Sequence, residues 1–84
     1  QILNNQSGSL LSGHQINIHA AGLNNTQGQI VAQQVLDIDA ELQALNNQQG
    51  LISSDTVNST SGLLNNDQGL IQSNSAMMID TQGQ

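Results

Sequence analysis

The chain has 84 residues, with six Asp and Glu and no Lys or Arg, so its formal net charge is −6 at pH 7. Without cations to displace counterions from phosphates or to hold anionic headgroups, neither nucleic acid nor lipid is an expected partner. Phe, Trp, Tyr, Cys and Pro are absent, which excludes a disulfide framework and an aromatic core.

A six-residue pattern, Leu-Asn-Asn-x-x-Gly, opens the chain and then returns three times. Its copies begin at Leu3, Leu23, Leu45 and Leu64, so they are 20, 22 and 19 residues apart. Self-similarity at this period is typical of solenoids. The pattern predicts a single segment of a longer repeat array, with coils at approximately 1–22, 23–44, 45–63 and 64–84.

Short alternating runs follow each copy of the pattern. An apolar residue lies two positions after each Gly, and alternation resumes after a short break. Period-2 alternation between turns that contain Gly and Asn indicates strands rather than helices. A single coil cannot bury its own apolar residues, whereas stacked coils form a continuous core. The expected fold is therefore all-β, a parallel β-helix (β-solenoid) of about four coils of 19–22 residues.

Stacking places equivalent residues above one another, so the core is predicted as columns. One column is Leu3, Leu23, Leu45 and Leu64, and a second is Leu10, Ile30, Ile52 and Ile71. The remaining core positions are Ile16, Ile18, Leu36, Ile38, Met77 and Ile79.

The repeated polar residues are assigned to the same stacking. The first Asn of each pair is predicted to form a ladder of side-chain amides, through Asn4, Asn24, Asn46 and Asn65. The Gly column is expected to supply either positive φ or close approach at the next bend, at Gly8, Gly28, Gly50 and Gly69. Asn at every corner is too regular for a specific ligand site.

The third coil departs from this register. Strict spacing would place Asn58 inside the coil, where the other coils have Leu or Ile. Deleting one residue before Val57 turns Val57, Ser59 and Ser61 inward instead. We therefore predict a one-residue slip, with Val57 buried and Asn58 exposed.

The sequence resembles the haemagglutinin repeats of two-partner-secretion exoproteins. The resemblance rests on Leu-Asn-Asn-x-x-Gly-x-Ile-x-Ala, followed by alternating strands such as Val-Leu-Asp-Ile-Asp-Ala at residues 35–40. That group includes filamentous haemagglutinin adhesins and the stalks of contact-dependent growth inhibition toxins. It implies a right-handed β-helix on the bacterial outer surface, secreted through an outer-membrane partner. A host or target-cell receptor would be bound through other regions. The lack of basic residues counts against glycosaminoglycan binding.

The few residues that could carry chemistry do not form a repeated set. Asp37 and Asp39 point outward on one coil, but no basic residue accompanies them. His14 and His19 have Gln34 and Asp39 as repeat equivalents, so neither belongs to a ligand column. We expect His19 and Asp39 to form an exposed lateral pair, and we expect no enzymatic activity, no cofactor and no metal.

Outward apolar pairs are also predicted. Leu51 lies beside Leu70, and Leu11 lies beside Val31. Such pairs mark either a docking site for another segment or a small apolar patch on a rod.

Two functions fit these observations. The first is a rod or spacer in a large surface adhesin or toxin-delivery protein, with flanking β-helix coils as its immediate partners. The alternative is a subunit of a self-assembling extracellular fibre, because Gln- and Asn-rich coils stack through cross-β ladders. Unequal coil lengths favour the rod, since an in-register polymer gains from identical repeats.

Overall fold

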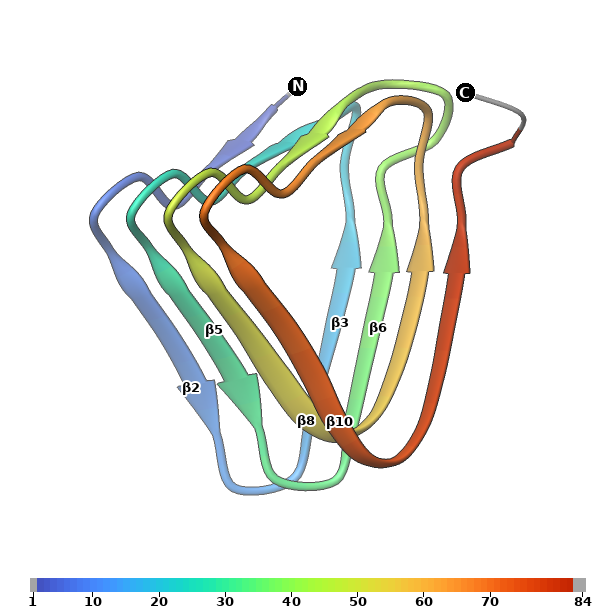
Figure 1. The fold of residues 1–84 in the computed structure, drawn as a ribbon. Coiled ribbons are helices and arrows are strands. Elements are labelled where there is room, and N and C mark those ends of the chain that lie inside the picture. The colour runs from blue at the N-terminus through green and yellow to red at the C-terminus, as the bar shows by residue number, and fades with distance from the viewer. Residues whose placement is uncertain (1, 83–84) are drawn as a thin grey trace.

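The computed structural model describes residues 2–82, which form four stacked coils around a three-sided interior (Figure 1). All of the strand pairs are parallel and no helix occurs in that range. The coils wind in a right-handed sense (Figure 1), which is the hand that parallel crossover connections favour. The predicted fold class is confirmed.

Each coil contributes strands to three faces. The first face consists of the two-residue strands β1 (Leu3–Asn4), β4 (Leu23–Asn24), β7 (Leu45–Asn46) and β9 (Leu64–Asn65). The second face consists of β2 (Ser9–Ser12), β5 (Gln29–Ala32) and the first parts of β8 (Leu51–Thr60) and β10 (Leu70–Asp80). The third face consists of β3 (Gln15–His19), β6 (Val35–Asp39) and the later parts of β8 and β10.

The register follows the repeat. Leu23 pairs with Leu3 on one side and Leu45 on the other, and Ile30 likewise pairs with Leu10 and Ile52. Parallel pairing of equivalent residues stacks apolar side chains directly over one another. Each fully buried Leu or Ile then contributes about 1.5–3 kcal/mol.

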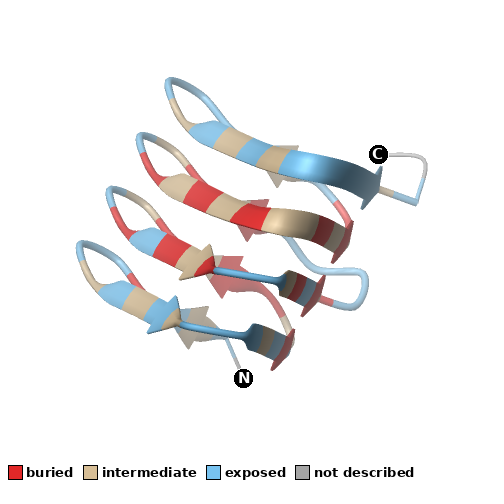
Figure 2. Ribbon diagram, turned by 90° about the horizontal axis from the view of Figure 1, so that it is seen from below, coloured by how far each residue is buried: buried red, intermediate tan, exposed pale blue. Residues whose placement is uncertain are grey.

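Most of the core lies in the two middle coils (Figure 2), and Ile18 of β3 adds to it from the first coil. Its buried apolar residues are Ile18, Leu23, Ile30, Ala32, Leu36, Ile38, Leu45, Ile52 and Val57. The outer coils contribute partly buried side chains that pack against this core, namely Leu3, Leu10, Ile16, Leu64 and Ile71.

Two residues of the predicted core are exposed. Met77 and Ile79 are 40% and 37% exposed. Both lie in the last part of β10, which pairs with β8 on one side. Their side chains have a neighbouring coil below them and none above among residues 2–82, so inward position alone does not bury them.

The one-residue slip in the third coil is confirmed. On the second face Ile30 pairs with Ile52, but on the third face Leu36 pairs with Val57, so the offset falls from 22 to 21 residues. Val57 is fully buried, whereas Asn58 points outward and is half-buried. The shortening falls at the corner between the two faces, and it leaves β8 as one continuous strand of ten residues.

Candidate functional site

The most regular constellation in the structure is a column of buried asparagine side chains at the corner after the first face. Asn5 donates from Nδ2 to Oδ1 of Asn25 at 2.7 Å, Asn25 donates to Asn47 at 2.7 Å, and Asn47 donates to Asn66 at 2.8 Å. Asn25 and Asn47 are completely buried. Buried amides need such partners, because an unpaired one costs about 1–3 kcal/mol.

The same side chains also bind the backbone of the following coil. Nδ2 of Asn5 donates to the carbonyl of Gln29 at 3.1 Å, and Nδ2 of Asn25 donates to that of Leu51 at 3.2 Å. Every step of this asparagine ladder therefore runs from one coil to the next coil along the chain. The ladder has a direction.

The ladder lies one residue further along than the sequence predicted. The first asparagines, Asn4, Asn24, Asn46 and Asn65, instead accept the N–H of the residue two positions on, each at 3.1 Å. Between coils, Asn24 donates to Asn4 at 3.4 Å. The first Asn belongs to a first-face strand and its side chain caps the turn, whereas the second lies at the corner and points inward.

The glycines serve close approach rather than positive φ. The left-handed backbone falls on the residue before each Gly, with φ of 58° at Ser7, 58° at Gln27, 57° at Gln49 and 59° at Gln68. A Cβ on Gly28 would overlap the carbonyl oxygen of Asn5, and one on Gly50 would overlap that of Asn25. Gly69 meets Asn47 in the same way, whereas Gly8, in the first coil, has only its own Asn5 nearby.

A second, exposed ladder was not predicted. Gln27 donates from Nε2 to Oε1 of Gln49 at 3.2 Å, and Gln49 donates to Gln68 at 3.0 Å. These are the residues of the three later coils whose backbone has the left-handed conformation. The signal was present in the sequence, because Gln occupies the fifth position of the motif in all three copies.

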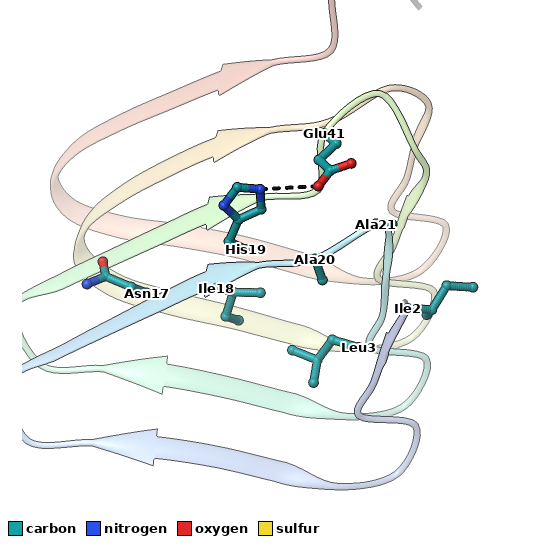
Figure 3. A pocket seen from close by; sticks show the side chains of 8 residues that line it. All are labelled: Ile2, Leu3, Asn17, Ile18, His19, Ala20, Ala21 and Glu41. Atoms are coloured by element: carbon teal, nitrogen blue, oxygen red, sulfur yellow. Dashed lines mark hydrogen bonds and ion pairs between the residues drawn. The ribbon is translucent and has the colours of Figure 1, made fainter.

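The predicted pairing of His19 with Asp39 is wrong. Although the two residues are neighbours in the strand register, Nε2 of His19 lies 3.2 Å from Oε2 of Glu41 (Figure 3). The Asp39 carboxylate instead bonds the backbone, since its Oδ1 accepts a hydrogen bond from the N–H of Glu41 at 2.9 Å. The His19 and Glu41 side chains are 70% and 51% exposed, so the pair adds at most about 1 kcal/mol.

A concavity of about 560 Å³ lies beside this pair. Figure 3 shows Leu3 and Ile18 at its floor and His19 and Glu41 at its rim. It lies at the open side of the first coil, where inward-facing apolar side chains have no coil against them. Its shape thus follows from the stacking, and its rim carries one His–Glu pair.

The other candidate residues do not converge. The side chains of His14 and Asp37 are exposed, and they lie apart, His14 in the bend between β2 and β3 and Asp37 in β6. Among residues 2–82, no three His, Cys, Asp or Glu side chains gather closely enough to hold a metal ion. That part of the chain also contains no helix long and apolar enough to cross a membrane.

The geometry defines a β-solenoid repeat protein, in which the repeated residues join one coil to the next. The haemagglutinin-repeat family matches residues 1–84, so the chain belongs to that family. Comparisons with curated proteins and with solved structures gave no match. The family is a structural, adhesin-type repeat of secreted filamentous-haemagglutinin-type proteins in two-partner secretion, and it is not an enzyme family.

Proposed function

We propose that residues 1–84 are a rod element whose function is to set distance, within an array that continues in coils of the same kind. The observation that carries the proposal is the division between repeated and single residues. The repeated Leu, Ile, Asn and Gly are spent on stacking, through buried columns and the asparagine ladder. A binding site needs convergent polar groups in a concavity, and apart from the single His19–Glu41 pair the His and acidic residues are dispersed.

The proposal places recognition and toxicity elsewhere in the parent protein. It also places the rod on the bacterial surface after export through an outer-membrane partner, with a host or target-cell receptor bound by other regions. Family membership supports this setting, and either an adhesin or a toxin-delivery stalk is compatible with it.

The test is an in-frame deletion of these four coils from the parent protein. Export, surface exposure and receptor binding or toxin delivery are then measured. A shorter stalk that retains binding supports the spacer, whereas loss of receptor binding with normal export contradicts it. A matched variant keeps the length and replaces His14, His19, Asp37, Asp39 and Glu41 by Ser or Asn. It should behave as the unaltered protein.

A second candidate is the self-assembling fibre, and the direction of the asparagine ladder favours it. Within residues 2–82, Nδ2 of Asn66 donates no hydrogen bond, and Oδ1 of Asn5 accepts none. One end of the ladder thus offers a donor and the other an acceptor, so two copies could stack head to tail. Electron microscopy of the isolated 84-residue chain distinguishes the two: unbranched filaments indicate the fibre, and short particles indicate the rod.

A further inference from the structure

The outer surface of the second face carries apolar side chains and no charged ones. Outward positions of its strands carry Leu11, Val31, Leu51 and Leu70, which we call the oblique apolar band. Leu11 and Leu70 are 67% and 50% exposed, and Val31 and Leu51 are half-buried. The outward positions between them are Ser and Gln.

The strand register gives the band its shape. Leu11 pairs with Val31 in the first two coils, and Leu51 pairs with Leu70 in the last two. Val31, however, pairs with Ser53, so the upper Leu pair lies two positions earlier along the strands than the lower pair. Two positions along a strand are about 7 Å. The band therefore crosses the face obliquely.

This face carries no charge. The outward residues of its strands are Ser, Gln, Leu and Val. The six carboxylates lie on the third face or at corners: Asp37, Asp39, Glu41, Asp55, Asp67 and Asp80. A cationic partner would bind near the carboxylates, because the second face offers it no ion pair. Two copies of this chain, each with charge −6, repel one another least when these uncharged faces meet.

We infer that the oblique apolar band is a self-association surface, on which a second copy of the chain docks through a two-fold axis. A two-fold contact requires a self-complementary patch, and an uncharged band flanked by Ser and Gln meets that requirement. Because the band is oblique, aligning two bands makes the two rods cross. The patch is small, so the dimer is weak and reversible, as transient contacts are.

The test is sedimentation equilibrium of the 84-residue chain at increasing concentration and 0.15 M salt. A monomer–dimer equilibrium is expected. Leu11→Gln with Leu70→Gln should weaken it by about tenfold or more, because the new residues match their polar neighbours and leave the inward columns intact. Leu42→Gln is the control, since Leu42 is 72% exposed at a corner away from this face. Circular dichroism verifies that each variant is folded.

Cross-linking locates the dimer contact independently. The chain has no native Cys, so a single introduced Cys reports on its own position. Val31→Cys, at the middle of the band, should give cross-linked dimers with a short thiol reagent. Asn17→Cys, exposed on the third face, should not. A chain that stays monomeric at millimolar concentration overturns the inference. So do equal cross-linking at both sites, and open-ended oligomers that are insensitive to the Leu11 and Leu70 substitutions.

Discussion

At the scale of single residues, two adjacent asparagines have different structural roles in every coil. Asn25 is completely buried, accepts from Asn5 and donates to Asn47 and to the carbonyl of Leu51. Asn24 is half-buried, and its Oδ1 caps the turn by accepting from the N–H and the hydroxyl of Thr26. The two positions therefore differ in what a truncation leaves unpaired.

Replacing Asn25 by Ala should lower the free energy of unfolding by about 3 kcal/mol or more, since it leaves buried donors and acceptors in two other coils without hydrogen-bond partners. Asn24→Ala, its neighbour, removes a turn cap near solvent and should cost about 1 kcal/mol. Urea unfolding followed by circular dichroism measures both. Equal losses would show that the ladder adds nothing beyond local turn capping.

The turn that follows offers a second adjacent pair. Gly50→Ala should destabilise by about 2–4 kcal/mol, because the added Cβ overlaps the carbonyl oxygen of Asn25 in the coil below. Gln49→Gly should change stability by less than about 1 kcal/mol, since it relieves a left-handed backbone and gives up two exposed amide bonds. Thermal unfolding of the two variants tests this. A larger loss for Gln49→Gly would mean that the exposed Gln ladder stabilises more than close coil contact does.

At the scale of one element, β8 is the most polar strand of the interior. Ser54 and Ser59 are 4% exposed, and their hydroxyls have no hydrogen-bond partner among residues 2–82. Ser59 pairs with Ile38 on one side and Ile79 on the other. A small polar side chain thus interrupts an otherwise apolar column.

Ser59→Val should therefore stabilise the chain by about 1 kcal/mol, because it removes an unpaired buried hydroxyl and adds apolar contact between two Ile side chains. Ser53→Val, which points outward on the same strand, is the control and should be close to neutral. Differential scanning calorimetry compares their melting temperatures. A marked decrease for Ser59→Val would show that the hydroxyl is hydrogen-bonded in solution, for instance to an internal water.

At the scale of the whole molecule, stability accumulates coil by coil. Each coil contacts its immediate neighbours, so the free energy is approximately a sum of coil terms and interface terms. The asparagine ladder, the strand pairing and the apolar columns all repeat with the same period. A coil can be removed as a unit, provided that the phase of the repeat is kept.

Deleting residues 45–63 should leave a folded three-coil chain. The deletion joins Ala44 to Leu64, so Asn66 takes the position that Asn47 holds in the asparagine ladder. Its urea m-value should fall in proportion to the buried surface lost. Deleting residues 45–54 is the matched control and should unfold the chain, since half a coil puts the ladder out of phase. If both deletion variants fold equally well, the phase of the repeat does not determine the structure.

The sequence by itself determined the fold and the register. Four copies of Leu-Asn-Asn-x-x-Gly at unequal spacing fit parallel coils with variable corners. The slip in the third coil could also be predicted, because only the shifted register turns Val57 inward. Periodicity is sufficient for these conclusions, since side chains in a strand alternate between faces and equivalent residues of stacked coils coincide.

Only the tertiary structure decided how the corners are built. Which Asn points inward depends on the backbone direction at the bend, and what crowds a Gly is a carbonyl from a coil about 20 residues away. Glu41 takes His19 as its partner because the longer corner of the second coil, with φ of 60° at Glu41, brings that carboxylate back over the third face. Met77 and Ile79 have the core pattern but are exposed, because no coil among residues 2–82 lies above them. Alternation predicts the direction of a side chain, whereas its burial depends on what lies above it.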